Sequence, residues 1–412
     1  MSKNGVLMGN SKKVLMVIPH MVGGGAERVS SQIINQMNSC GYDTKFILTS
    51  SKKNEVVRTD LNEKTELILL TEELKAETVF EKLRYLPSKI FSIFFGKIYE
   101  KQGKYVPASI GKATIMWQYH REIKYIRNMM LENPDMAVIA FSLPAMPIVA
   151  LAKRGLKNTV VLSERADPNP LMKKRYGKKF IEKYFVNADK MVFQTYDAKA
   201  VYPECVSKKG VVISNPLKDN LPQPYHGERN KYITTFCRVS QQKNLPLLVE
   251  AFSKLNKEHP DYILRIIGDA PNKEGEDVFN YIKNQIEELG LTDSVKFEPA
   301  MKKVHDAIIK DAMYVNSSDF EGISNAMLEA MAIGMPSVCT DCPIGGANAT
   351  IKNGENGILV PIKDVDALYK GMKRVVEDKE LADKLSNNAS KLREELSLDR
   401  ITQKWIELLG DN

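Results

Sequence analysis

The sequence predicts an α/β protein with two domains, each built on a parallel sheet covered by helices on both faces. Short apolar segments alternate with longer amphipathic segments along almost the whole chain, which is the pattern of parallel sheets. This alternation stops in a polar, proline-containing stretch at 215–230 and starts again at Tyr232. With 412 residues, 43% of them hydrophobic, the chain is long enough to bury two cores.

In the first half, the segments expected to form strands are 13–18, 43–49, 66–70, 136–141, 158–162, 189–193 and 210–213. In the second half they are 232–237, 262–267, 294–297, 312–316, 336–339 and 357–360, and the last helices fill about 364–409. The predicted domain organisation is an N-terminal domain at 1–214, a linker at 215–230, a C-terminal domain at 231–394 and a final helix within 395–412. A segment at about 76–132 interrupts the alternation and is expected to be a helical insertion.

Composition places the chain among globular proteins of a reducing compartment. No segment approaches the roughly 18 uninterrupted apolar residues of a spanning helix, and the start lacks an apolar signal-peptide core. The five cysteines are scattered, so no disulfide framework is expected and the cytoplasm is the predicted location. Cys339 and Cys342 have a spacing that can ligate zinc or serve redox chemistry, but no second pair completes a site, so we expect no metal there.

A glycine-rich turn follows the first strand. Lys12–Met37 contains an apolar strand, three consecutive glycines including Gly24 and Gly25, and a helix. Glycines let a backbone approach a ligand closely. They do not have the G-x-G-x-x-G spacing of a dinucleotide site, and no acidic residue ends the next strand, so a NAD enzyme is a weak alternative. The turn either faces a ligand or is a tight turn without one.

Two cations lie where a strand is expected to end. Thr234–Phe252 comprises a short apolar strand, a polar turn with Arg238 and Lys243, and an amphipathic helix. Ligands of open α/β sheets bind outside the carboxyl ends of the strands, where these two side chains could neutralise a diphosphate. The alternative is two solvated cations on a surface loop.

Two carboxylates surround a predicted helix start. In Ser317–Pro336, Glu321 precedes a helix expected to begin near Ser324 or Asn325, and Glu329 lies about a turn and a half inside it. The N–H groups of a helix start can hold a phosphate or a hydroxyl, and carboxylates accept hydrogen bonds from sugar hydroxyls. The alternative is an ordinary amphipathic helix with both glutamates in solvent.

Taken together, Arg238-x4-Lys243 and Glu321-x7-Glu329 resemble the signature of the family 4 retaining glycosyltransferases. These enzymes have two facing Rossmann-like domains, the GT-B architecture. In this fold the final helix crosses back to the N-terminal domain, so residues from about 395 onward are expected to pack there. The chain resembles in particular the bacterial subgroup that makes surface polysaccharides and lipid-linked oligosaccharides. Further similar motifs are GGAER at 24–28, SERADP at 163–168, SNP at 214–216, IIGDAP at 266–271 and NGENGILVP at 353–361.

The resemblance implies a transfer reaction without a cofactor or a metal. A nucleotide sugar, UDP with a hexose or an N-acetylhexosamine, would be the donor, and a lipid-linked or polymeric glycan the acceptor. Arg238 and Lys243 would neutralise the diphosphate, Glu321 would bind hydroxyls of the transferred sugar, and Glu329 those of the ribose. The N–H groups of Gly322, Ile323, Ser324 and Asn325 are implied to support the donor. The loop with Gly24 and Gly25 is implied to close over the donor phosphates or to face the acceptor.

Two positions depart from the family pattern. Cys237 stands before Arg238 where many members have glycine, so the turn can approach the diphosphate differently. Many members also have a histidine where this chain has Ser163-Glu164-Arg165. Glu164 is our candidate for contacting the primary hydroxyl of the sugar, and a buried structural pairing with Arg165 or another cation is the alternative.

The segment Lys82–Arg127 carries excess positive charge, with ten Lys or Arg against two Glu and many interspersed aromatic residues. Such segments bind anionic membrane interfaces, which suggests a peripheral location at the inner face of the cell membrane. The alternatives are a basic face over a normal core and a channel for an acidic polymer. No recognisable motif accompanies the charge, so we do not expect nucleic-acid binding.

Three classes of function stay open. A retaining sugar transferase is favoured. An epimerase, or a phosphorylase, would use the same architecture, although a pyridoxal phosphate lysine context is not recognisable. A catalytically silent partner would tend to lose Arg238, Lys243, Glu321 and Glu329, which are all present.

Overall fold

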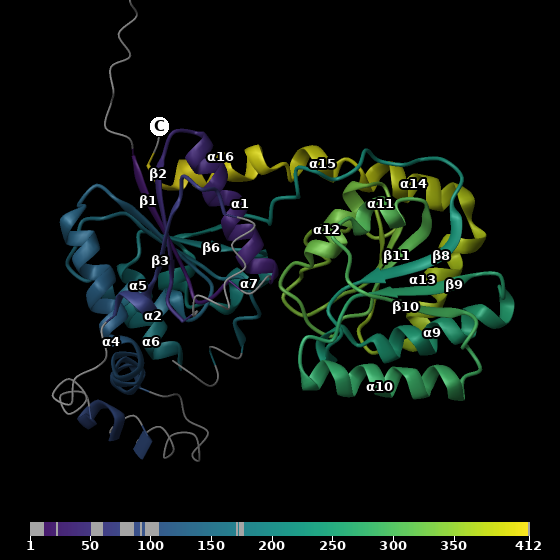
Figure 1. The fold of residues 1–412 in the computed structure, drawn as a ribbon, viewed down its shortest axis with the longest axis horizontal. Helices are drawn as coiled ribbons and strands as arrows, with labels where there is room; N and C mark the ends of the chain where they lie inside the picture. The colour runs from purple at the N-terminus through teal and green to yellow at the C-terminus, as the bar shows by residue number, and fades with distance from the viewer. Residues whose placement is uncertain are drawn as a thin grey trace, which may run out of the picture. The chain divides into compact units, whose positions relative to one another are not determined.

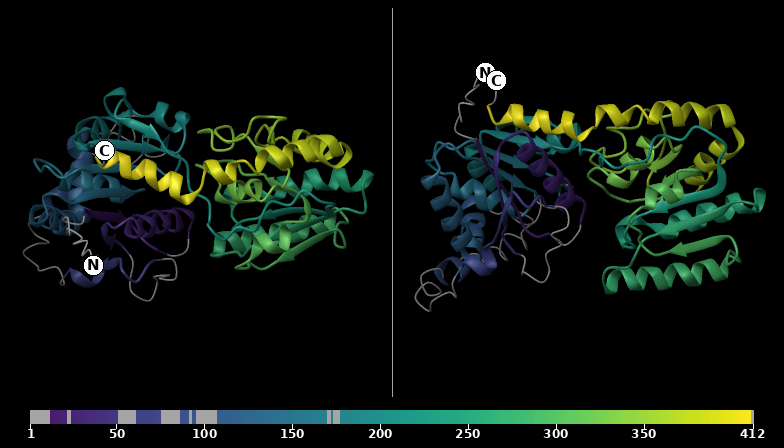
Figure 2. Two further views of the ribbon diagram at one scale, coloured as in Figure 1. Left: turned by 90° about the horizontal axis from the view of Figure 1, so that it is seen from above. Right: turned by 45° about the horizontal axis from the view of Figure 1, so that its top comes forward.

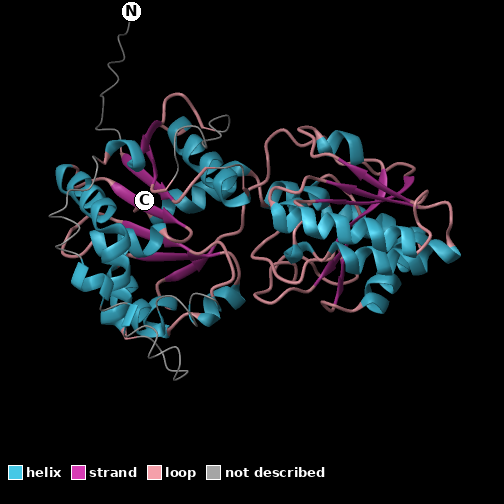
Figure 3. Ribbon diagram, turned by 60° about the horizontal axis from the view of Figure 1, so that its bottom comes forward, coloured by secondary structure: helices cyan, strands magenta, loops and turns pink. Residues whose placement is uncertain are grey.

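The computed structural model describes residues 12–21, 24–50, 61–74, 86–90, 93–94, 107–169, 172 and 177–410 (Figure 1). The chain divides into two compact units. The N-terminal unit contains Met1–Pro216 together with Leu398–Asn412, and the C-terminal unit contains Leu217–Ser397. Each unit is an α/β layer structure in which helices cover a parallel sheet (Figure 3), so the predicted fold class is confirmed.

The N-terminal unit has a seven-stranded parallel sheet with the order β3-β2-β1-β4-β5-β6-β7. The first strand, β1, lies inside this sheet, with β2 and β3 on one side of it and β4 to β7 on the other. Its strands are β1 (Lys13–Ile18), β2 (Asp43–Leu48), β3 (Glu66–Leu69), β4 (Ala137–Phe141), β5 (Val160–Ser163), β6 (Lys190–Phe193) and β7 (Gly210–Val212).

The main helices of this unit are α1 (Gly25–Ser39), α4 (Ala108–Glu132), α5 (Ala145–Ala152) and α6 (Gly177–Tyr184), with short segments α2 (Leu70–Glu73), η4 (Phe185–Asn187), α7 (Tyr196–Val201) and α8 (Glu204–Ser207). Packing of α4, α5 and α6 against the sheet buries one continuous apolar core. Helix α4 belongs to the predicted insertion and contains a non-helical residue, Tyr119. The insertion residues 76–85, 91–92 and 95–106 lie outside the described part.

The last helix, α16 (Leu398–Leu408), packs in the N-terminal unit beside α1 (Figure 2). Trp405 of α16 is fully buried, with its ring centroid 5.9 Å from that of Phe141 at the end of β4. The guanidinium of Arg165 lies 4.6 Å from the Phe141 ring centre and 5.1 Å from that of Trp405. A buried cation stacked on two rings therefore anchors the end of the chain.

The C-terminal unit has a six-stranded parallel sheet with the order β10-β9-β8-β11-β12-β13. Strands β8 and β11 are neighbours, so the loops that follow them share one edge of the sheet. The strands are β8 (Asn230–Phe236), β9 (Ile263–Ile267), β10 (Val295–Glu298), β11 (Asp311–Asn316), β12 (Ser337–Thr340) and β13 (Ile358–Val360).

Its helices are η5 (Gln241–Lys243), α9 (Leu245–Glu258), α10 (Lys273–Glu288), α11 (Val304–Ile308), α12 (Asn325–Ala332), α13 (Val365–Glu377), α14 (Lys379–Ala389) and α15 (Leu392–Glu395). Helices α9 and α10 lie side by side (Figure 1) and, with α13, pack on the sheet to form the core of this unit.

Side-chain caps set the helix starts at the carboxyl edge of this sheet. Asn244 has a left-handed backbone, and its side chain accepts a hydrogen bond from Leu247 N at the start of α9. The Ser324 hydroxyl accepts from Met327 N at 3.3 Å and caps α12. The predicted start of α12 is therefore confirmed. This helix ends before Gly334, whose φ of +80° explains the glycine there.

Among the residues that the structure describes, no helix combines the length and the apolar character that crossing a bilayer requires.

Candidate active site

The loops after β8 and β11 bring the predicted cation and carboxylate into contact. The Lys243 ammonium forms a short ion pair with Oε1 of Glu321, although the two residues are 78 positions apart in sequence. Their side chains are only 14% and 12% exposed. The two residues are brought together because β8 and β11 are neighbours in the sheet.

Two further side chains orient Glu321. The Ser318 hydroxyl donates to Oε1 at 2.9 Å, and Gln242 Nε2 donates to Oε2 at 3.2 Å. Burial acts to lower the pKa of Lys243, but the carboxylate of Glu321 outweighs this effect, so the pKa of Lys243 is raised. The sequence analysis did not identify Ser318 or Gln242. The only sequence signal for them is their position beside the predicted residues.

Backbone and side-chain hydrogen bonds join the two loops into one rigid edge. Asp319 N donates to Gln242 O at 3.0 Å, and Asn244 Nδ2 donates to Oδ1 of Asp319 at 2.8 Å. The Ser317 hydroxyl donates to Lys243 O at 2.8 Å. A ligand that contacts one of these loops therefore contacts groups whose positions are also fixed by the other loop.

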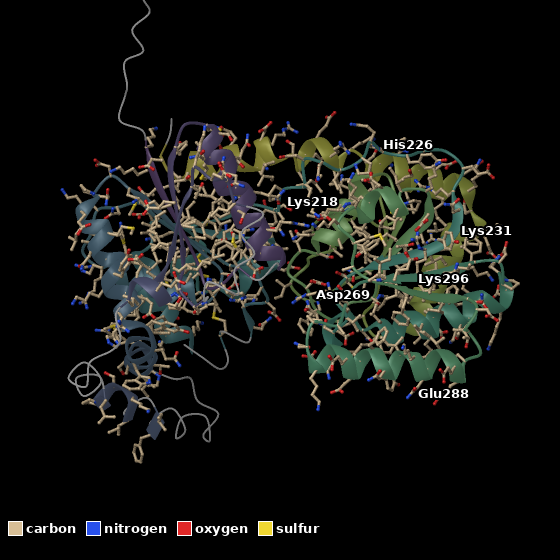
Figure 4. The ribbon with its side chains drawn as sticks, in the orientation of Figure 1. Lys218, His226, Lys231, Asp269, Glu288 and Lys296 are labelled. Atoms are coloured by element: carbon tan, nitrogen blue, oxygen red, sulfur yellow. The ribbon has the colours of Figure 1, made fainter. Side chains whose placement is uncertain are left out.

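Arg238 lies next to this edge and is exposed. It lines a cavity of about 320 Å³ within the C-terminal unit, together with residues that end β8 and β9 and that precede α11. Its positive charge is close enough to Lys243 to act, as a smaller effect, to lower the pKa of that side chain. Asp269, labelled in Figure 4, lines the same cavity. Two cations thus converge beside a cavity at the carboxyl ends of the strands.

Close backbone packing shapes the cavity wall. Gly268 of the IIGDAP motif has a φ of +150°, and a Cβ there would lie 1.8 Å from the carbonyl oxygen of Cys237. The turn before Arg238 therefore lies directly against the end of β9, and only glycine fits at this contact. Burial raises the pKa of the Cys237 thiol, which stays a small apolar group in the wall.

Glu329 is not in solvent, in contrast to the amphipathic-helix alternative. It is 3% exposed, and its Oε2 is 2.8 Å from Nε2 of His305 in α11. The sequence analysis did not identify His305, because a single histidine on a short helix carries no pattern.

The predicted backbone groups after Glu321 occupy the loop that enters α12. Gly322 and Asn325 are partly exposed, whereas Ile323 and Ser324 are buried. A Cβ on Gly346, in the loop after β12, would lie 1.8 Å from the carbonyl oxygen of Gly322. The sequence analysis did not single out Gly346, whose contact fixes the position of this loop.

Gly24 and Gly25 lie at the start of α1 in the N-terminal unit, where Gly24 is the N-cap. A Cβ on Gly24 would lie 2.1 Å from a carboxylate oxygen of Glu27, so a larger residue would displace that side chain. Glu27 also pairs with His20 at 3.1 Å. The role of the two glycines in ligand binding stays a prediction.

Glu164 is 2% exposed and follows β5 in the N-terminal unit. Its Oε1 accepts from Arg165 N at 3.0 Å and Ala166 N at 3.1 Å, and its Oε2 accepts from the Tyr202 hydroxyl at 2.6 Å. Burial raises the pKa of Glu164 despite these hydrogen bonds. The carboxylate is thus held by two backbone N–H groups and a tyrosine hydroxyl, and the sugar contact stays a prediction.

The Cys339 and Cys342 side chains are both buried, and the Cys342 thiol is 3.0 Å from the carbonyl oxygen of Ser318. Burial raises the pKa of both thiols, that of Cys342 to about 12. Metal ligation requires thiolates, so this environment does not favour it.

Comparisons with known proteins identify relatives of this chain. Residues 218–392 match the profile of the family described as "Glycosyl transferases group 1". An uncharacterized glycosyltransferase of Haemophilus influenzae is 26% identical over 54% of this chain and 61% of its own length. The N-acetylgalactosamine-N,N'-diacetylbacillosaminyl-diphospho-undecaprenol 4-alpha-N-acetylgalactosaminyltransferase of Campylobacter jejuni is 28% identical over 39% of this chain and 41% of its own length. The matched regions thus cover less than two thirds of these relatives.

Among solved structures, Anabaena HepE in complex with UDP has a TM-score of 0.73 at 17% identity, with 97% of this chain and 99% of that chain covered. Such a likeness shows the fold of the whole chain. The C-terminal unit, which carries Arg238, Lys243, Glu321 and Glu329, therefore belongs to the glycosyl transferases group 1 family, and the chain as a whole has the GT-B fold.

Proposed function

We propose that the protein is a retaining glycosyltransferase that moves a hexose or an N-acetylhexosamine from a nucleotide sugar to a lipid-linked or polymeric glycan. The observation that carries this proposal is the convergence of Arg238 and the Lys243–Glu321 pair beside a cavity at the carboxyl edge of the C-terminal sheet. Phosphate-bearing ligands bind at this edge in open α/β sheets.

The chemistry needs a group that stabilises the departing diphosphate. When the bond between the anomeric carbon and the diphosphate oxygen breaks, that oxygen keeps the electron pair and negative charge grows on the diphosphate. Arg238 and Lys243 supply two positive charges there, and Glu321 holds the ammonium in place. The acceptor hydroxyl attacks the anomeric carbon from the side of the leaving group, and a diphosphate oxygen takes its proton, so the configuration is retained.

UDP is the donor nucleotide that we propose, and its release needs no metal. A fold neighbour, Anabaena HepE, has been solved with UDP and with UDP-glucose, which supports UDP as the first nucleotide to test. Two cations at the strand ends can neutralise a diphosphate, which is the role that a divalent ion would otherwise have.

The direct test compares single alanine variants in the presence of EDTA with UDP-sugars as donors. Removing one preorganised charge that stabilises a leaving group typically lowers kcat by about 10²–10³-fold. We expect losses of that order for Arg238→Ala and Lys243→Ala. The matched control is Lys231→Ala, which removes an exposed lysine paired with Asp261 on the same unit (Figure 4). Near-normal turnover in both site variants would overturn the assignment.

The same assay separates the other classes of function. An epimerase would convert the nucleotide sugar without an acceptor, so the product formed in the absence of acceptor identifies it. A silent partner would bind a nucleotide sugar or glycan but release no nucleotide. Nucleotide release that requires both the acceptor and Arg238 supports the transferase.

We further propose that the protein acts in the cytoplasm, at the inner face of the cell membrane, on a lipid-linked acceptor. The C. jejuni relative is named for a diphospho-undecaprenol substrate. In this chain, Leu86, Ile90, Ile93 and Phe94 are 39–61% exposed within nine residues, and the ammonium of Lys89 lies 4.9 Å from the ring centre of Trp117. Exposed apolar side chains with adjacent cations suit an anionic membrane surface.

Vesicle sedimentation tests this location. Ile90→Glu and Phe94→Glu should each weaken binding to vesicles rich in phosphatidylglycerol, and high salt should weaken the binding of the unaltered protein. Tyr281→Glu is the control, because Tyr281 is 61% exposed on α10 of the other unit. Binding that none of the substitutions at 86–94 reduces would refute this use of the segment.

A further inference from the structure

Glu329 of α12 and His305 of α11 form a buried pair in the C-terminal unit. The two side chains are 4% and 6% exposed, and Glu329 Oε2 is 2.8 Å from His305 Nε2. An imidazole with its hydrogen on Nε2 can donate it to an ionised Glu329 carboxylate, which only accepts hydrogen bonds. A buried carboxylate needs such a donor, because an unpaired charge in this environment is costly.

The histidine ring is also held from a second direction. Its centroid is 5.5 Å from that of Phe236, and the two rings meet edge to face at 86°. Phe236 is the last residue of β8, two positions before Arg238, and it lines the cavity. Val304, the neighbour of His305 in α11, lines the same cavity.

His305 therefore connects the cavity wall to α12. The strand end that presents Arg238 carries the ring that fixes His305, and His305 in turn fixes the carboxylate of Glu329. A side chain locked by both packing and a hydrogen bond holds its partner in one rotamer, which is what an oriented acceptor requires.

We propose that His305 is a positioning residue for the donor nucleotide, holding the carboxylate of Glu329 in the orientation from which it accepts hydrogen bonds from the ribose hydroxyls. This inference rests on the proposed function, in which the nucleotide occupies this site. His305 does not touch the donor. It acts through Glu329, so its loss should affect recognition of the ribose and leave the diphosphate contacts of Arg238 and Lys243 in place.

The test compares the affinities of the purified protein for UDP and 2′-deoxy-UDP by calorimetry. A hydrogen bond to a charged group is worth enough that the unaltered protein should bind UDP about tenfold or more tightly than 2′-deoxy-UDP. In His305→Ala this ratio should fall to between about one and three, mostly through weaker UDP binding. In His305→Gln, whose amide N–H can occupy the place of Nε2–H, the ratio should stay high.

The control for a general effect of removing a His–Glu pair is His259→Ala. His259 Nε2 is 3.1 Å from Glu377 Oε1 on the same unit, outside the cavity, and its loss should leave the ratio unchanged. In Glu329→Gln the ratio should fall as in His305→Ala, and the double variant should show no further fall, because both changes remove the same recognition.

If His305→Ala does not fold, the comparison of His305→Gln with His305→Asn carries the test, because the shorter asparagine amide cannot reach Glu329 from the same backbone position. The expected result is a high ratio in His305→Gln and a low ratio in His305→Asn. If His305 had a merely structural role, its replacement would lower the melting temperature and weaken the binding of UDP and 2′-deoxy-UDP equally. That outcome overturns the inference, as does a ratio near one in the unaltered protein.

Failure of the proposed function gives a different result. The same ribo and 2′-deoxy comparison is made with GDP and ADP. If the unaltered protein binds none of these nucleotides, the proposed donor site is wrong and the role of His305 falls with it. A second outcome is that a nucleotide binds, Arg238→Ala weakens its binding, and His305→Ala leaves the ratio of the ribo and 2′-deoxy affinities unchanged. The proposed donor site then stands, and only the role of His305 is overturned.

Discussion

Replacing Gly346 by alanine should impair the proposed donor site through a single backbone contact. Gly346 is buried in the loop after β12, and a Cβ built on it lies 1.8 Å from Gly322 O and 2.9 Å from Gly322 C. Both atoms belong to the backbone, so no side chain can rotate away. Gly322 follows Glu321 directly, so whatever moves Gly322 also moves the carboxylate that holds Lys243.

The size of the effect follows from these distances. Real Cβ contacts are essentially never shorter than 3.0 Å, so the 1.8 Å separation must grow by at least 1.2 Å. Overpacking of this kind costs about 1–3 kcal/mol of the free energy of unfolding. A displacement of about 1 Å at a catalytic group can lower the rate about 100-fold. We therefore expect Gly346→Ala to fold, with reduced stability and a kcat/KM about two orders of magnitude lower.

The assay is steady-state transfer from the nucleotide sugar, with urea unfolding measured on the same samples. Gly227→Ala is the matched control, because the three atoms nearest to a Cβ there all belong to the Tyr225 side chain, the closest being its hydroxyl at 2.5 Å, and this side chain can move. We expect the control to keep its activity. Full activity in Gly346→Ala would show that the loop can shift without consequence and would refute the argument that this contact sets the position of Glu321.

Three further predictions concern packing and charge. Trp405→Ala removes the buried ring that stacks on Arg165 and should lower the free energy of unfolding by about 3–5 kcal/mol. Urea unfolding measures this loss, with Lys404→Ala as the control. A loss below about 1 kcal/mol would contradict the prediction. Burial raises the pKa of Glu164 in the folded protein above 4.5. The protonated carboxyl therefore contributes stability that is fully present below pH 4.5 and is lost as the pH rises through the folded pKa. Glu164→Gln stays neutral and should melt at least as high as the unaltered protein at pH 7.5, with the advantage vanishing near pH 4; a much lower melting temperature at pH 7.5 would show that the fold needs the charge. Glu321 raises the pKa of Lys243 in the folded protein above 10.5. The difference in the free energy of unfolding between the unaltered protein and Lys243→Gln should therefore stay constant up to about pH 10 and become smaller above pH 10.5. A difference that disappears near pH 7 would contradict the pairing.

The fold could be predicted because both sheets are parallel. Strands buried on both faces form short continuous apolar runs, and each run here is bounded by polar turns. The predicted segment 312–316 corresponds to β11 at Asp311–Asn316, and 262–267 corresponds to β9 at Ile263–Ile267. The parts of the insertion at 76–85, 91–92 and 95–106 lie outside the described residues, so its helical character is tested at 86–90, at 93–94 and in α4, which are all helical.

Within the site, strand ends could be predicted and contacts between other segments could not. Arg238, Lys243 and Glu321 each follow a strand, and neighbouring strands bring their loops together whatever the rest of the sequence is. His305 lies on a five-residue helix 24 positions before its partner Glu329. A lone histidine has no periodic or spacing signal, so only the packed structure identifies the pair.

The role of the SERADP motif at 163–168 could not be assigned from the sequence either. A charged pair after a strand predicts a ligand contact as readily as a structural one, because the carboxyl edge of a sheet holds both kinds of group. Which role applies depends on what covers the edge, and here the cover includes Trp405, about 240 residues further along the chain. With the ring in place, Arg165 is 8% exposed, donates to Ser163 Oγ at 2.7 Å, and burial lowers its pKa to about 9. Arg165 is thus assigned to anchoring α16, and a charged motif of this kind can be interpreted only once the distant segment that packs on it is known.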